Sequence, residues 1–510
     1  MRSAVIAALA CTVLCAQAPR AEEAAVKAHM AFLADDLLEG RGTGQRGGDL
    51  AVRYLETQLQ ALGLKPGNGS SYRQTVAVAG LRVDPRRSGL AFTGSHGTVT
   101  PEFGAELVFG PAAAQAELPV AAPLVFVGHG IFDPGLRDDY KGFDAKGKVL
   151  VMVVGERSGE PVGPLCCQPS NYYGRWTYKF EEARRRGAAG VLLIHTDGSA
   201  GYRWPVVLNS WTGERFQQAE AGGFGAFQGW LTESAARKVL AASGQDLAEL
   251  RLRAEKPDFK PVTLGIQALG QVSSFVRRLE QSNVAGILPG TDPLLKEQVV
   301  IFSAHWDHFG IGPAPERAIY HGAIDNASGC AGVLAIAKAM AAQPSKRSLM
   351  FLFPCGEEQG LLGSGAYVKA PLWPLARTVL VVNLESLNFA GATRDIGLMG
   401  AVNPAVRALC EQAAKSLDLF ISPAKADPAG LCFRADHFPF AKAGVQAVSP
   451  GFSLDGGWEY RGDKAAAQAK AAAFLERYHR PSDQMDPSWD LAGMMQQVQF
   501  CLELGRLAGH

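Results

Sequence analysis

The feature that most constrains the fold is a series of short apolar runs in the second half of the chain. These strand-like runs are 299–304, 349–353, 379–382 and 445–448. A helical pattern of small residues at 327–340 lies between the first two runs. A continuous apolar run is typical of a strand that is covered on both faces of a sheet. The alternation of such runs with helical patterns predicts an α/β fold with a mostly parallel central sheet flanked by helices.

Titratable side chains follow three of these runs directly, at the edge where open α/β sheets place their sites. The residues in these positions and in two loops are His305, Asp307, Asp325, Glu357, Glu358, Glu385 and His479. Taken singly, each has a structural interpretation, since a buried histidine is more often part of a core and Asp325 could cap the following helix. Taken together, two imidazoles and several carboxylates without a thiolate are typical of a catalytic zinc site.

The overall composition excludes several other classes of protein. Apolar residues make up 47% of the 510 residues and charged residues 19%, which excludes a disordered chain. Lys and Arg total 50 against 49 for Asp and Glu, so the formal charge of +1 predicts no nucleic-acid partner. Nine cysteines without CxxC spacing are too few for a disulfide scaffold. The composition is that of a globular chain of about three domains.

The first residues have the order of a secretory signal peptide. The positive start Met1-Arg2 is followed by a mostly apolar run at 4–16 and the small-residue pattern Ala16-Gln17-Ala18. The run is shorter than the ~20 residues that span a membrane, so we expect a signal peptide at 1–18 and no transmembrane span. The protein is then exported, to the periplasm or the extracellular space. Lipid attachment at a leader cysteine stays open as an alternative.

The first half of the mature chain divides into two parts. Residues 24–120 combine amphipathic helical spacing with a turn-rich, strand-patterned stretch, and we expect them to form the N-terminal part of the larger domain. Residues 123–265 form a smaller α/β unit, which interrupts a larger domain that resumes at 283–510. The strand-like runs of the smaller unit are 124–127, 149–154 and 191–194.

Six short segments, taken together, are similar to the motifs of a known enzyme family. In chain order they are Ala304-His305-Trp306-Asp307-His308, Asp325-Asn326-Ala327-Ser328-Gly329, 356–364, Asn383-Leu384-Glu385, 436–440 and Tyr478-His479-Arg480-Pro481-Ser482-Asp483. On these segments the chain resembles the co-catalytic zinc aminopeptidases, which are related to glutamate carboxypeptidases, glutaminyl cyclases and the transferrin receptor. Residues 40–44 resemble the family's N-terminal segment. Residues 123–265 resemble the inserted protease-associated domain of its secreted bacterial members.

The resemblance implies a role for each residue of the set. The ligands that it implies for two Zn²⁺ per chain are His305, Asp325 and Glu385 for one ion, and Asp325, Glu358 and His479 for the other. Asp325 then bridges the ions, Glu357 is the general base and Asp307 orients His305. Many relatives carry aspartate where Glu385 stands.

The chemistry that the resemblance implies is hydrolysis by an activated water. Two zinc ions carry four positive charges, which three carboxylates and one hydroxide balance, so a water in the site can lose its proton near neutral pH. Glu357 accepts that proton and passes it to the leaving amine. The expected activity is removal of N-terminal residues from a peptide substrate.

Other functions on such a fold stay open. They are a zinc carboxypeptidase or dipeptidase, a glutaminyl cyclase, and a non-catalytic binding protein. Retention of all five implied ligands favours hydrolysis over the cyclisation that a glutaminyl cyclase catalyses. The unit at 123–265 could shape the substrate entrance, or serve as a spacer or a surface for a partner. The sequence implies no oligomeric state.

Overall fold

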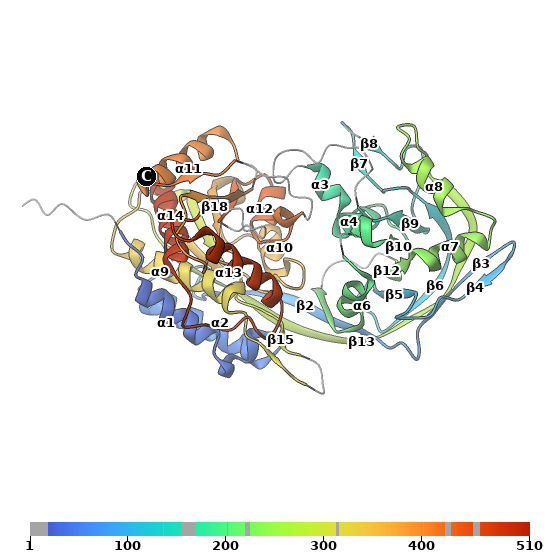
Figure 1. The fold of residues 1–510 in the computed structure, drawn as a ribbon, viewed down its shortest axis with the longest axis horizontal. Coiled ribbons are helices and arrows are strands. Elements are labelled where there is room, and N and C mark those ends of the chain that lie inside the picture. Colours follow the sequence, from blue (N-terminus) through green and yellow to red (C-terminus); the bar gives the residue numbers. More distant parts are fainter. Residues whose placement is uncertain are drawn as a thin grey trace, which may run out of the picture.

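The protein has two lobes joined by two long strands, β2 (Arg73–Val83) and β13 (Val262–Leu288), as Figure 1 shows. The structure is a computed structural model. It describes residues 19–135, 137–155, 169–200, 202–219, 225–312, 316–400, 402–423, 430–451 and 459–510. The signal peptide expected at 1–18 lies outside the described residues.

The larger lobe is built on a mixed central sheet. Its strands, in spatial order, are β20 (Leu398–Met399), β22 (Ala447–Pro450), β18 (Thr378–Asn383), β14 (Val299–Ser303), β17 (Ser348–Phe353) and β13. The four strands from β22 to β17 run parallel, whereas β20 and β13 pair antiparallel at either side of them. The expected α/β fold with a mostly parallel sheet is confirmed.

Alternate residues of the central strands enter two different cores. Val300 and Phe302 of β14 pack into the core under α9 and α14, whereas Val299 and Ile301 pack into a second core with Tyr367 and Phe440. Both faces of the strand are therefore buried, which explains why it is apolar at every one of these positions. The helices of this lobe are α1 (Glu23–Leu33), α2 (Arg46–Ala61), α9 (Gly329–Ala341), α10 (Leu362–Lys369), α11 (Pro404–Ser416), α12 (His437–Lys442), α13 (Lys464–Arg477) and α14 (Ala492–Gly509).

The smaller lobe has a sheet of its own, which continues from the far part of β13. Its strands follow in the order β6 (Glu117–Phe126), β9 (Val149–Val153), β10 (Gly190–His195), β12 (Phe227–Thr232) and β5 (Leu107–Pro111). The first four run parallel and β5 is antiparallel to β12. The helices are α3 (Pro169–Gly174), α4 (Trp176–Arg185), α5 (Asp197–Ala200), α6 (Trp204–Thr212), α7 (Glu233–Ala241) and α8 (Leu247–Ala254).

A single strand, β13, belongs to both sheets. Residues 284–288 pair with β17 in the larger lobe, 274–284 pair with β2, and 262–273 pair with β6 in the smaller lobe. The two lobes are thus connected by continuous backbone pairing. The remaining short elements are β1 (Lys65–Pro66), β3 (Gly89–Gly94), β4 (Gly97–Val99), β7 (Phe132–Asp133), β8 (Arg137–Asp138), β11 (Arg215–Gln218), β15 (Gly310–Ile311), β16 (Ile319–Tyr320), β19 (Asp395–Ile396), β21 (Phe420–Ile421), η1 (Asp36–Arg41), η2 (Leu295–Glu297), η3 (Ala323–Ser328), η4 (Leu375–Arg377) and η5 (Leu431–Phe433).

Among the described residues, no helix is both long and apolar enough to cross a bilayer.

Candidate metal centre

Three strands of the central sheet deliver the candidate residues to one edge. His305 lies shortly after the end of β14, Glu357 and Glu358 after β17, and Glu385 after β18. These strands are parallel neighbours, so their carboxyl ends coincide. Asp325 reaches the same place from η3, which leads into α9.

The first group of side chains surrounds the imidazole of His305, which is fully buried. Its Nε2 lies 3.0 Å from Oε1 of Glu385, 3.3 Å from Oδ1 of Asp325 and 3.9 Å from Oε2 of Glu357. Ligand atoms of His305, Glu357 and Glu385 all lie within 4.8 Å of one another, close enough to hold one metal ion.

The second group surrounds Glu358, which lies between two imidazoles. Its Oε1 is 2.6 Å from Nδ1 of His308, and its Oε2 is 3.3 Å from Nε2 of His479. The same nitrogen of His479 lies 3.1 Å from Oδ2 of Asp325. Asp325 is therefore common to both groups. Donor atoms of His308, Asp325 and Glu358 also lie within 4.8 Å of one another, so His308 is a further candidate ligand at this position.

The loop that carries Asp325 is fixed by a second carboxylate. Asp483 accepts hydrogen bonds from the backbone N–H groups of Ile324 and Asp325, at 3.0 and 3.1 Å. The next side chain, Asn326, donates to the carbonyl of Leu384 at 3.0 Å, one residue before Glu385. All three bonds are buried, so the position of Asp325 is set by segments far apart in the sequence.

Asp307 contacts both His305 and Glu357, but through different atoms. Nδ1 of His305 lies 3.1 Å from the main-chain carbonyl oxygen of Asp307 and 3.9 Å from its carboxylate. The carboxylate instead accepts a hydrogen bond from the backbone N–H of Glu357, at 3.1 Å. Thr43 donates to its other oxygen at 3.4 Å. The carbonyl contact fits a His305 tautomer with the proton on Nδ1, which leaves Nε2 free to act as a ligand.

A buried arginine holds the loops behind the centre. Arg41, at the end of η1, donates from Nε to the carbonyl of Trp306 at 2.9 Å and from its Nη atoms to the carbonyls of Leu33, His321 and Gly322. Its guanidinium is almost completely buried. Because Trp306 lies between His305 and Asp307, Arg41 connects the N-terminal segment to the backbone of the site.

The carboxylates of the site repel one another electrostatically. Burial raises the pKa of Glu357 well above its usual range, and Glu385 and Glu358 raise it further against the opposing effect of His305. Burial likewise raises the pKa of Glu358, and Asp325 adds to the rise although His479 opposes it. Unneutralised negative charge in a buried site is costly, and a bound cation removes that cost.

Asp325 differs from the other acids of the site. Burial acts to raise its pKa, but hydrogen bonds with His305 and His479 outweigh burial and hold the pKa well below its usual range. Asp325 is therefore the acid most strongly held as a carboxylate.

The donor atoms of the site match the metal that the sequence implies. Imidazole nitrogens and carboxylate oxygens, with no thiolate among them, are the ligands of catalytic zinc. His308 adds a buried imidazole whose Nε2 has no hydrogen-bond partner among the described residues. Burial lowers the pKa of His308 to about 3, so this imidazole is neutral at physiological pH and can act as a donor or a ligand. The residues present fit zinc.

Comparisons with known proteins identify the larger lobe. Residues 283–502 match the model of peptidase family M28. We refer to these matched residues as the M28 domain. All the candidate residues described above except Arg41 and Thr43 lie within the M28 domain. The match covers less than half of the 510-residue chain, and the donor set of the matched part fits zinc.

Individual known proteins are similar to this chain either in a short stretch of sequence or in structure. A vacuolar membrane protease from Verticillium alfalfae is 36% identical over 94 residues, which are 18% of this chain and 8% of that protein. An aminopeptidase from Aneurinibacillus sp. strain AM-1 has a similar structure over 96% of this chain and 95% of its own, with 20% identity and a TM-score of 0.54. A zinc aminopeptidase from Bacillus subtilis aligns over 95% and 93%, with 16% identity and a TM-score of 0.42. The Aneurinibacillus structure shares the fold of this chain.

Three residues of the M28 domain that lie at or near the site had no role assigned from the sequence. They are His308 beside Glu358, Asp483 beneath Asp325, and Asp436, which is buried and accepts a hydrogen bond of 2.5 Å from Ser364. Each lies within a segment that resembled the family. Their position in those segments was the only available signal, because their partners come from distant loops.

Proposed function

We propose that this chain is an exported aminopeptidase that uses two bound zinc ions to remove N-terminal residues from peptides. The observation that carries the proposal is the position of Asp325, whose two oxygens face two different imidazoles, His305 and His479. A carboxylate in this position suits a ligand shared by two metal ions. The shared fold with an aminopeptidase from Aneurinibacillus favours this activity over other peptidase activities.

The proposed ligands form two sets that share Asp325. The sets are His305, Asp325 and Glu385 for one zinc, and Asp325, Glu358 and His479 for the other. Zinc bound there would supply Lewis acidity and lower the pKa of water in the site. The nearly complete burial of His305 and Asp325 keeps bulk water away from this charge, which strengthens electrostatic interactions with the substrate.

Glu357 is the residue that we assign to proton transfer. It lies next to the ligand Glu358, yet its own carboxylate is farther from Nε2 of His305 than those of Glu385 and Asp325. Its backbone is held by the carboxylate of Asp307. In the proposed reaction, Oε2 of Glu357 accepts a proton from the attacking water and passes it to the nitrogen of the leaving amine.

Export is proposed from the N-terminal sequence. Residues 1–18 combine a positive start, an apolar run and a small-residue pattern in the order that signal peptides have. Mass spectrometry of the protein secreted by a bacterial host should show an N-terminus at or near residue 19. An intact Met1 on the exported protein would contradict this part of the proposal.

The catalytic assignment is tested by Glu357→Gln, which keeps the size of the side chain and removes its basicity. We expect turnover of peptides to fall by about 10³-fold while the zinc content stays unchanged. The matched control is Glu411→Gln, an exposed position on α11, which should keep full activity. Full activity of the Glu357 variant would remove Glu357 from its proposed role.

A further inference from the structure

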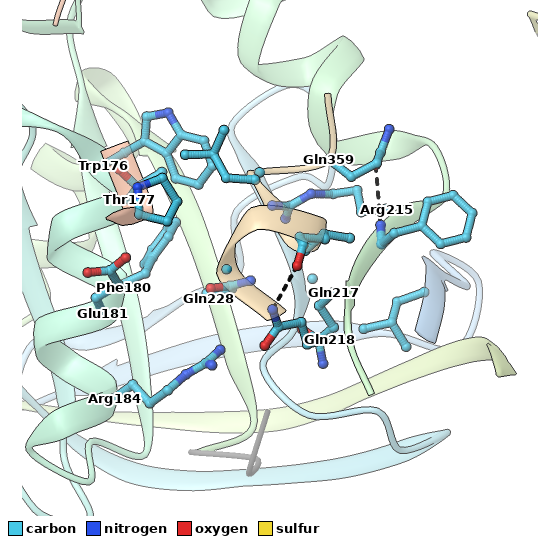
Figure 2. A pocket seen from close by; sticks show the side chains of 18 of the residues that line it. Trp176, Thr177, Phe180, Glu181, Arg184, Arg215, Gln217, Gln218, Gln228 and Gln359 are labelled. Carbon is cyan, nitrogen blue, oxygen red and sulfur yellow. Dashed lines mark hydrogen bonds between the residues drawn. The ribbon is translucent and has the colours of Figure 1, made fainter. Parts of the chain in front are cut away.

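A cavity of about 550 Å³ is lined by residues of both lobes (Figure 2), and none of the proposed zinc ligands is among its lining residues. One wall comes from α4, β11 and β12 of the smaller lobe. The opposite wall comes from the M28 domain, at 359–362, α10 and α12. Its volume is in the range of sites that hold small ligands or several residues of a peptide.

The cavity begins next to the catalytic residues along the chain. Gln359 lines it and directly follows Glu358, the proposed zinc ligand. Consecutive Cα atoms are ~3.8 Å apart, so the backbone of this wall continues directly from that of the proposed ligand. An extended peptide advances ~3.3 Å per residue. A substrate with its N-terminus at the centre would therefore reach the cavity with the residues that follow the scissile bond.

The cavity wall holds an arginine, Arg215, that has no acidic partner among the described residues. Arg215 stacks on the indole ring of Trp211, with its guanidinium carbon 3.6 Å from the ring centroid. Among the described residues, no carboxylate forms an ion pair with it, and the neighbouring Glu214 is bound by Arg277 at 2.9 Å. Burial lowers the pKa of Arg215 to about 10, which still leaves the guanidinium charged at neutral pH.

The rest of the lining favours a negatively charged guest. Arg184 and Lys442 also line the cavity, as does Lys369, which donates to the amide oxygen of Gln218. Among the described lining residues the acid is Glu181, which is bound by Lys442 at 2.6 Å. The amide nitrogen of Gln217 is buried and has no hydrogen-bond partner among the described residues. A cationic lining with an unused amide donor suits an anion that carries several acceptor oxygens.

We propose that this cavity is a subsite for a carboxylate of the substrate peptide, downstream of the scissile bond, with Arg215 as its main contact. The inference rests on the proposed aminopeptidase function and gives that enzyme a preference for acidic peptides. Trp176 and Phe180 provide apolar wall beside the cationic groups, so the peptide backbone and its acidic group can be held together. The smaller lobe thereby contributes to substrate selection.

The experiment compares pairs of amidated pentapeptides with a free N-terminal Leu, in which one position from the second to the fifth is Glu or Gln. A further pair has a free or an amidated C-terminus, which separates a side-chain carboxylate from a terminal one. We expect kcat/KM of the zinc-loaded enzyme to be about tenfold higher for the acidic member at one or more positions. Arg215→Gln should abolish that difference and leave hydrolysis of the Gln peptides within about twofold of wild type.

Two further variants separate charge from structure. Arg215→Lys keeps the charge and should retain part of the preference, and Arg203→Gln, at an exposed position outside the cavity, should retain all of it. Equal rates for acidic and neutral peptides at every position would overturn the subsite while leaving the aminopeptidase function intact. An equal loss on both peptide classes in Arg215→Gln would overturn it as well. Failure to hydrolyse any free peptide would remove both proposals.

Discussion

The two carboxylate oxygens of Asp325 face different histidines: Oδ1 lies 3.3 Å from Nε2 of His305, and Oδ2 lies 3.1 Å from Nε2 of His479. These histidines come from parts of the chain that are far apart, one from the end of β14 and the other from the loop after α13. Their arrangement around one acid makes Asp325 the centre of the proposed two-metal site. Asp483 holds the backbone of Asp325 in this position.

Replacement of the shared acid should therefore affect both metals. In Asp325→Asn the side chain loses its charge and one of its two acceptor oxygens, so we expect the zinc content to fall from about two ions per chain to below one. Inductively coupled plasma mass spectrometry of the dialysed protein measures this directly. The matched control is Asp49→Asn at an exposed position of α2, which should bind zinc normally. Loss of only one ion would show that Asp325 is not shared.

His308 should influence the second metal through Glu358. The 2.6 Å contact between its Nδ1 and Oε1 of Glu358 fixes one oxygen of that ligand. In His308→Gln we expect one zinc to dissociate about 10- to 100-fold more readily, the usual effect of losing a group that orients a ligand. Competition with a chelating dye reports the two release steps. His96→Gln, at an exposed position of the smaller lobe, is the control, and identical release curves for both variants would refute the role of His308.

Arg41 should be needed for the stability of the larger lobe. It donates hydrogen bonds to four main-chain carbonyl groups, and these acceptors would lose a buried partner in Arg41→Met. We expect the free energy of unfolding to fall by at least about 3 kcal/mol, as measured by urea denaturation. Arg46→Met removes an arginine from the exposed start of α2 and should cost less than about 1 kcal/mol. Equal effects of the two changes would contradict this account.

His437 should make the fold sensitive to acid. Burial lowers its pKa to about 4, whereas the unfolded chain has a histidine pKa of about 6.5. The unfolded state therefore binds the proton more readily, and the contribution to stability that is full above pH 6.5 is lost as the pH falls toward 4. Between pH 7 and pH 5 this effect is on the order of 2 kcal/mol.

The substitution His437→Gln removes the titrating group. The difference in free energy of unfolding between pH 7 and pH 5 should be smaller in this variant than in the wild type by about that amount. Both proteins are measured by urea denaturation with the same zinc content, so that loss of metal affects them equally. A pH dependence that does not change would assign the acid sensitivity to other groups.

The sequence allowed the architecture of the larger lobe to be predicted because its central strands are buried on both faces. Each face of β14 packs into a different core, and this leaves a continuous apolar run that can be recognised without the structure. The extent of β13 could not be anticipated in the same way. Its burial changes repeatedly along the strand as its pairing partners change from one lobe to the other.

For the candidate site, the sequence indicated which side chains follow the strands but not how loops join them. The contact between His308 and Glu358 spans 50 residues, and that between Asp483 and Asp325 spans 158. Asp307 contacts His305 through its main-chain oxygen, which no pattern of side chains encodes. Such contacts depend on the packed positions of loops, and these are set by tertiary structure.

The central claim is that the enzyme removes residues from free peptide N-termini. The most direct measurement is a product map by mass spectrometry of the zinc-loaded protein with the same peptides carrying a free or an acetylated N-terminus. We predict stepwise loss of N-terminal residues from the free peptides only, and no loss after the zinc has been removed by chelation. Cleavage of acetylated peptides at their C-termini, cyclised N-termini, or intact peptides under all conditions would contradict the claim.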